Sequence, residues 1–159
     1  QAWNFHLLMP HLTVLIHYDF PLVFQDNIKW ITDRMPVRKL LQLQNRCGIH
    51  LCLSETEGFG HYLMEAMSTS AVVITTDAPP MNEFITDKRC LVPYFKTENC
   101  KLAIRYFADP DELRNVVQNL MSLSPKELKE IGKKNRATYL QKTKEFEKNL
   151  KTLLNEVNI

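Results

Sequence analysis

Short apolar runs alternate with helical patterns along this chain, and this alternation limits the fold more than any other feature. The runs mostly lack a polar–apolar alternation and occupy residues 12–17, 28–32, 49–53, 71–75 and 90–92. Continuous apolar runs are typical of strands that helices cover on both faces in a parallel sheet. Because helical patterns separate the runs, the sequence predicts an α/β domain with a Rossmann-like, doubly wound parallel sheet.

Helical spacing of apolar residues marks two segments between these runs, residues 37–46 and 60–68. Further along, two segments repeat a helix-start signature, in which a capping residue precedes a proline and an acid follows. These segments are Asp109-Pro110-Asp111-Glu112 and Ser124-Pro125-Lys126-Glu127. We expect a helix of roughly three turns after the first signature and a long helix after the second.

The long final helix carries an apolar stripe on one side. Its members are Tyr139, Phe146, Leu150, Leu153, Leu154 and Val157. Residues 126–151 also hold nine Lys or Arg against four Glu. This excess suits contact with an acidic membrane, but a solvated helix face is the favoured interpretation. By contrast, residues 94–107 show no readable pattern, and we predict an irregular insertion there.

Composition places the chain among ordinary soluble domains. With 159 residues, 45% of them hydrophobic, one domain with a full core is expected. A formal charge of +2 gives no reason to expect nucleic-acid binding through bulk charge. No apolar run approaches the ~20 residues that span a bilayer, and no secretory signal is visible. We therefore expect a cytoplasmic location. Because the sequence begins with Gln1, we expect a processed, trimmed or partial chain.

The cysteines, histidines and first residues give weaker signals. No CxxC pair occurs among Cys47, Cys52, Cys90 and Cys100, so they are interpreted as buried thiols of a reducing compartment rather than disulfides or zinc ligands. The histidines show no ligand spacing, and no metal role is expected for His6, His11, His17 and His50. If this chain is truncated, we expect its first residues to lie exposed, namely Trp3, Phe5 and Leu7.

Two carboxylates, Glu57 and Glu65, have seven residues between them, which include a glycine-aromatic-glycine turn. Gly58 and Gly60 let the backbone approach a ligand closely and adopt torsions that other residues resist. If a helix starts near Gly60, the free N–H groups of its first turn favour a diphosphate. Glu65 would then clamp the paired hydroxyls of a ribose, and Glu57 would accept hydrogen bonds from sugar hydroxyls. The pattern indicates a nucleotide-sugar pocket.

A simpler interpretation is that Glu57 caps the helix and that Glu65 is a solvated helix residue. For either glutamate alone this reading is preferred, but for the pair between two buried strands the functional reading is stronger. His61 shares a helix face with Glu65. It either donates to a phosphate, pairs with Glu65, or lies partly exposed without a role.

At this point a family resemblance can be stated. The chain resembles the retaining GT-B glycosyltransferases of family 4 type, which carry an E-x7-E motif and include relatives of sucrose and glycogen synthases. The resemblance rests on Ser54-Glu55-Thr56-Glu57-Gly58-Phe59-Gly60, Glu65-Ala66-Met67, Ala71-Val72-Val73-Ile74 and Asp77. It covers residues 8–157, as the C-terminal, donor-binding half of such an enzyme.

The resemblance implies roles for individual residues. Glu65 would bind the ribose hydroxyls, and Glu57 would contact the transferred sugar and stabilise charge at its anomeric carbon. The sugar and diphosphate would meet the segment that contains Gly58, Phe59, Gly60, His61, Tyr62 and Leu63. Thr32 would border the nucleotide base. Transfer would be metal-independent and need no cofactor.

Departures from the family pattern also carry predictions. The family's domain opens with a central strand, and with an arginine and a lysine that bind the diphosphate, and these are missing from this chain. The loss would split the sheet. Four other basic residues could be offered in their place, but their spacing does not support such a replacement; they are Lys29, Arg34, Arg38 and Lys39. In addition, Ser70 and Val72 stand where the family usually has glycine and proline.

The resulting hypothesis is a retaining glycosyltransferase, of which this chain is the donor-binding part and inactive by itself. Its domain would occupy residues 1–122, and a helical extension at 123–159 would pack on it. Partners would be a nucleotide sugar, an acceptor glycan, lipid or protein, and an N-terminal GT-B domain in the same or another chain. Two alternatives stay open: a non-catalytic nucleotide-sugar-binding or scaffold module, and one subunit of a split transferase.

Overall fold

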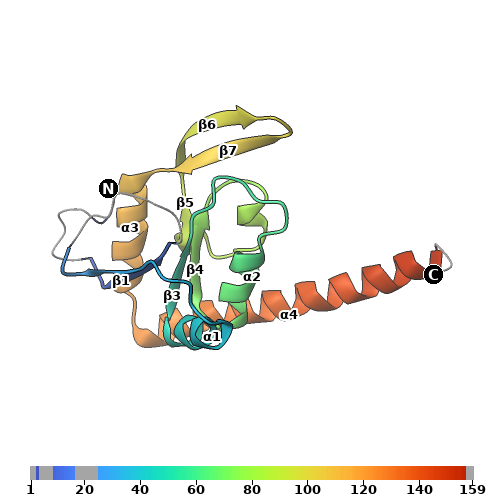
Figure 1. Ribbon diagram of the computed structural model, residues 1–159, viewed down its shortest axis with the longest axis horizontal. Coiled ribbons are helices and arrows are strands. Elements are labelled where there is room, and N and C mark those ends of the chain that lie inside the picture. Colours follow the sequence, from blue (N-terminus) through green and yellow to red (C-terminus); the bar gives the residue numbers. More distant parts are fainter. Residues whose placement is uncertain (1–2, 4–8, 17–24, 157–159) are drawn as a thin grey trace.

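The computed structural model describes residue 3, residues 9–16 and residues 25–156. Within these ranges the chain is a mixed α/β fold with parallel sheets and helices at its C-terminal end, so the predicted α/β class is confirmed (Figure 1). The elements, in chain order, are β1 (Leu12–Leu15), β2 (Ile28–Ile31), α1 (Val37–Arg46), β3 (Ile49–Cys52), α2 (His61–Ser68), β4 (Val72–Thr76), β5 (Leu91–Val92), β6 (Tyr94–Cys100), β7 (Ala103–Ala108), α3 (Pro110–Met121) and α4 (Pro125–Glu156).

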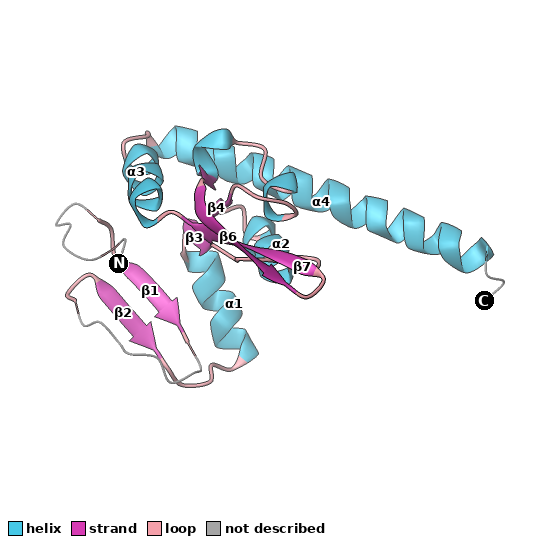
Figure 2. Ribbon diagram, turned by 90° about the horizontal axis from the view of Figure 1, so that it is seen from above, coloured by secondary structure: helices cyan, strands magenta, loops and turns pink. Residues whose placement is uncertain are grey.

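Two separate parallel sheets replace the single sheet that is usual for a Rossmann-like domain. One has the order β3-β4-β5, with Ile49 opposite Val72, and the other pairs β1 with β2. Within residues 9–16 and 25–156, no ladder joins β1 to β3. Seen from above, the β1–β2 pair lies apart from β3 and β4 (Figure 2). The predicted split of the sheet is therefore confirmed.

The core lies around β4, which is buried along its whole length. Helices α2 and α4 pack on this strand, and α3 packs on β5. The other strands are only partly buried, and α1 buries none of its residues. The expectation that all strands are covered on both faces was wrong for β1 and β2, because α2, α3 and α4 pack on the three-stranded sheet.

Helix α4 is held against the turn between α2 and β4 by close backbone contact. A Cβ atom added to Gly132 would lie 2.0 Å from the carbonyl oxygen of Ser70. Nearby, the Asn135 side chain donates to the carbonyl of Ala71 at 2.9 Å, and Arg136 donates to the carbonyl of Ser68. Ser70 itself has a φ of 60°, so a serine occupies a left-handed position that favours glycine.

The second half of α4 extends away from the body of the domain (Figure 1). Ile131 is buried, and Tyr139 packs against the edge of the core. Beyond it the stripe is exposed, with exposed fractions of 55% for Phe146 and 56% for Leu153. Val157 lies outside the described residues. The assignment of residues 123–159 to a helical extension that packs on the same domain, and the boundary at residue 122, stay predictions.

Residues 94–107 were expected to be irregular, and this prediction was wrong. They form most of an antiparallel hairpin of β6 and β7, which projects beyond the sheet in Figure 1. The sequence pattern did not predict these strands because polar residues interrupt their apolar positions. Their turn also lacks the glycine that marks many hairpins, since Lys101 takes the positive φ of 50°.

Two smaller expectations are corrected as well. Trp3 is buried rather than exposed, and its indole N–H donates to the carbonyl of Pro10 at 3.0 Å. All four cysteines are free, but only Cys52 and Cys90 are buried, while Cys100 is exposed. The hypotheses for Phe5, His6, Leu7 and His17 concern residues outside the described ranges. Within the described ranges, no helix is long and apolar enough to cross a membrane.

Candidate functional site

The candidate site is built on the loop that joins the end of β3 to α2. Gly60 ends this loop in the left-handed conformation, with φ of 73°, and its carbonyl accepts from the amides of Leu63 and Met64 at 3.1 Å each. The predicted unusual torsion is thus confirmed for Gly60. For Gly58 φ is not positive, and an added Cβ would meet no atom within 4 Å.

Since the amide of Leu63 is already bonded, the donors left at the start of α2 are the amides of His61 and Tyr62. Neither of these two amides has a hydrogen-bond partner within the described part of the chain. The Leu63 side chain is fully buried, so it contributes to the core rather than to a ligand surface. Two adjacent free N–H groups at a helix start suit an anion.

Glu57 is held by a short relay of hydroxyl groups. The Tyr62 hydroxyl donates to Ser54 Oγ at 2.8 Å, and the Ser54 hydroxyl donates to Glu57 Oε1. The Ser54 backbone is fixed in turn, because Thr76 Oγ1 donates to its carbonyl at 2.9 Å. Burial raises the pKa of Tyr62 to about 12, so its hydroxyl keeps its proton and acts as the donor.

Glu65 is exposed on α2 and faces α1. The Gln44 side chain donates to Glu65 Oε2 at 3.0 Å, and both residues line the larger of two cavities described here. Burial, together with the smaller effect of the charges on Glu57 and Glu65, raises the pKa of the Cys52 thiol to about 12. Glu57 accepts from Ser54, which lies two residues after β3 ends at Cys52. Glu65 lines the same cavity as Cys52, so both carboxylates lie near the end of β3.

The larger cavity, about 810 Å³, opens where the sheet is split. Its walls come from β1 on one side and from α1 and β3 on the other, with Tyr62 and Glu65 at α2. Trp3, Val117 and Met121 add apolar surface. A mostly apolar cavity with a few polar groups is the usual form of a small-molecule site.

Phe59 and His61 form an exposed aromatic contact beside the loop. Their rings are 4.9 Å apart, and Phe59 also meets Phe146 of α4 at 6.4 Å. His61 makes no ion pair with Glu65 in the described ranges, so that alternative is wrong. Its donation to a phosphate stays a prediction.

Thr32 and the basic residues of the same region are not brought to the site. Thr32 follows β2, is exposed, and lines neither cavity. Four basic side chains are likewise exposed and line neither cavity, namely Lys29, Arg34, Arg38 and Lys39. A role for Thr32 at the nucleotide base stays a prediction.

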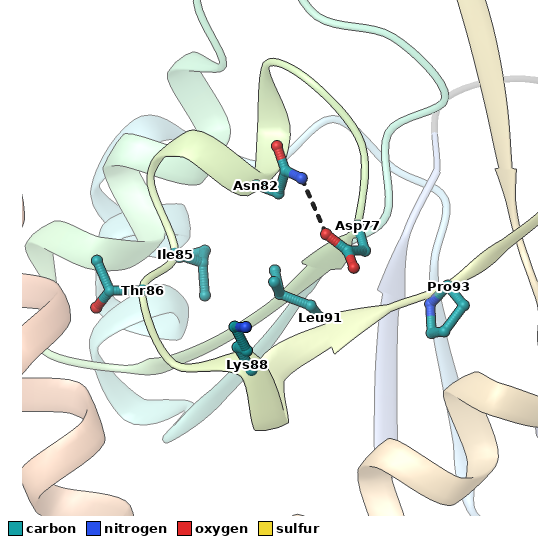
Figure 3. A pocket seen from close by; sticks show the side chains of 7 residues that line it. All are labelled: Asp77, Asn82, Ile85, Thr86, Lys88, Leu91 and Pro93. Carbon is teal, nitrogen blue, oxygen red and sulfur yellow. Dashed lines mark hydrogen bonds between the residues drawn. The ribbon is translucent and has the colours of Figure 1, made fainter.

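A second, smaller cavity of about 500 Å³ lies beside the end of β4 and β5 and shares no residue with the loop (Figure 3). The Asn82 side chain donates to Asp77 Oδ1 at 2.9 Å across its rim. Among the described residues, no group of three or more His, Cys, Asp or Glu could hold a metal ion.

Several residues of the site had no predicted role. Ser54 was part of the quoted motif, but nothing in its type indicated a bridge between Tyr62 and Glu57. Gln44 looks like any polar residue of an amphipathic helix. Glu55 is bound by Arg105, fifty positions later, and such long-range pairs leave no local pattern.

Comparison with known proteins gives one match. The family described as "Glycosyl transferases group 1" matches residues 22–138 of this chain. No curated protein matches the chain. The matched residues include β2, α1, the loop between β3 and α2 with both glutamates, and the packed half of α4.

Proposed function

This chain belongs to the group 1 glycosyl transferases, and from this premise we propose that it is the donor-binding part of a retaining enzyme. The donor would be a nucleotide-diphosphate sugar. The observation that supports this most is the position of Glu57 and Glu65 near the end of β3, with a left-handed glycine and two free amides between them.

Each group of the loop has a chemical task in this proposal. Glu65, which lines the larger cavity, accepts hydrogen bonds from the ribose hydroxyls. The His61 and Tyr62 amides and the positive end of the α2 dipole favour the diphosphate, both in the donor and as the leaving group. Glu57, held by Ser54, faces the sugar and stabilises positive charge that develops at the anomeric carbon.

In this mechanism the protein accelerates transfer by positioning the donor and stabilising charge, without a metal or cofactor. The acceptor, whether glycan, lipid or protein, would approach from an N-terminal GT-B domain in the same or another chain. Retention implies that the new bond has the same anomeric configuration as the donor. The one-bond C–H coupling constant at the anomeric carbon of the product tests this, and an inverted product contradicts it.

The open edge beside β3 favours a second candidate, one subunit of a split transferase. Within the described ranges, the larger cavity separates β1 from β3, and neither strand pairs across it. A strand supplied by further polypeptide would close the sheet and complete the donor site. A non-catalytic module would instead bind nucleotide weakly or not at all and have no such partner.

The donor-site assignment is tested by calorimetric titration of the full-length polypeptide with UDP, GDP and ADP. Glu65→Ala is expected to weaken binding of the preferred nucleotide by about tenfold or more, because two hydrogen bonds to a carboxylate are lost. Glu130→Ala, which removes a carboxylate from the exposed face of α4, is the matched control. Unchanged affinity in Glu65→Ala would contradict the ribose role.

A further inference from the structure

The β6–β7 hairpin is tied to the loop that carries Glu57. The amide of Tyr106 donates to the carbonyl of Glu55 at 2.6 Å, and Arg105 Nε donates to Glu55 Oε2 at 2.7 Å. A second guanidinium nitrogen of Arg105 also bonds to Glu55 Oε2. The hairpin thus holds both the backbone and the side chain of a residue two positions before Glu57.

The loop also accepts hydrogen bonds from elements other than the hairpin. Thr76 of β4 donates to the Ser54 carbonyl, and Tyr62 of α2 donates to the Ser54 hydroxyl. Ser54 and Glu55 are therefore fixed by three different elements, and Glu57 follows them directly. A loop anchored on both sides loses less conformational entropy when a ligand binds than a free loop does.

The hairpin's charges are arranged around Arg105. Its guanidinium lies 3.5 Å from Glu98 and 5.0 Å from the centre of the Phe107 ring. Lys96 also pairs with Glu98 and lies over the same ring at 5.3 Å, but it makes no contact with Glu55. Arg105 is thus the side chain of this charge cluster that connects the hairpin to the loop.

We propose that Arg105 is a positioning residue, which acts through Glu55 to set the loop that presents Glu57 to the transferred sugar. This inference rests on the proposed function and assigns the hairpin a task within the same site. In the described part of the chain, no hydrogen bond or ion pair joins the hairpin directly to Glu65 or to the first turn of α2, so we assign the task to the sugar and not to the nucleotide.

The test compares each nucleotide sugar with its own nucleotide diphosphate in the full-length polypeptide. Calorimetric titrations use UDP-glucose against UDP and GDP-mannose against GDP. Arg105→Ala is expected to weaken nucleotide-sugar binding about threefold to fivefold, as for a partly exposed ion pair, and to leave nucleotide-diphosphate binding within about twofold. Lys96→Ala removes the neighbouring cation of the same hairpin and should change neither affinity.

A second pair of variants separates positioning from general stability. Glu55→Gln should reproduce the effect of Arg105→Ala, and the double variant should be no weaker than either single one, because both act through one contact. A merely structural role would lower the melting temperature while the ratio of the two affinities stayed at its original value. That unchanged ratio would overturn the inference.

Failure of the proposed function gives a different result. If the unmodified polypeptide binds none of the nucleotides, or if Glu65→Ala binds as tightly as the unmodified protein, the donor site itself is wrong and the role of Arg105 falls with it. If Glu65→Ala loses binding while Arg105→Ala keeps the original ratio, only the hairpin's role is refuted.

Discussion

The hydroxyl of Tyr62 donates to Ser54 Oγ at 2.8 Å and thereby connects the first turn of α2 to the carboxylate of Glu57, which accepts from the same serine. A helix residue and a loop residue eight positions apart are joined in this way. The geometry of the loop is consequently coupled to the packing of α2 on β4.

Replacing Tyr62 with Phe removes only the hydroxyl of this relay. We expect the free energy of unfolding to fall by about 1 kcal/mol, the usual net value of a partly buried hydrogen bond. Urea unfolding followed by circular dichroism measures it. Tyr94→Phe is the matched control, because Tyr94 is 44% exposed and its hydroxyl has no hydrogen-bond partner within the described residues. Equal losses in both variants would contradict the relay.

Much of the fold could be predicted from periodicity, because the buried strands and the proline-marked helix starts are local signals. Helix α1 begins at Val37 and ends at Arg46, as its spacing of leucines indicates, and α3 begins at Pro110 behind its Asp109 cap. The hairpin was missed because its stabilising contacts, such as Arg105 with Glu55, join distant positions.

The candidate site was predictable in part for the same reason. Glycines and glutamates at fixed spacing located the loop and the left-handed Gly60. The bond from Gln44 to Glu65 and the burial of the Leu63 side chain depend on how α1 and α2 meet, which no local pattern encodes. The split of the sheet was expected from a family resemblance, and the cavity that opens there was not predicted from the residues that line it.

Alkaline pH should destabilise the protein. Burial raises the pKa of Cys52 and of Cys90 from an ordinary value of 9.0 to about 12, and that of Tyr62 from 10.0 to about 12. Below pH 9 these groups are protonated in both the folded and the unfolded chain, so their contribution to stability is complete. Above pH 9 the unfolded chain loses protons that the folded chain retains, and unfolding becomes easier.

Urea unfolding between pH 7.5 and 10.5 measures this dependence, with reducing agent present. The free energy of unfolding should fall as the pH rises above about 9, and more steeply above 10, where Tyr62 contributes. Cys90→Ala should have a shallower decline than the unmodified chain, because one of the three groups is gone. A flat profile up to pH 10.5 is the result that would refute the argument.

Gly132→Ala should destabilise the protein strongly. The new methyl group would lie 2.0 Å from the carbonyl oxygen of Ser70, so α4 must move away from the turn before β4. We expect a loss of about 2 kcal/mol or more, as for an overpacked core position. Gly48→Ala is the control, because a Cβ there meets no atom within 4 Å. Thermal unfolding of the two variants side by side decides the point, and equal melting temperatures would count against the close approach.

The two halves of α4 should respond differently to truncation of one side chain. Ile131 is 1% exposed and packs in the core, so Ile131→Ala should cost about 2–5 kcal/mol of unfolding free energy. Leu153 is 56% exposed on the projecting half, so Leu153→Ala should change it by less than about 0.5 kcal/mol. Urea unfolding at two protein concentrations measures both. A large loss in Leu153→Ala that grows with concentration would mean that a second copy covers the stripe in solution, because only an intermolecular contact makes stability depend on concentration.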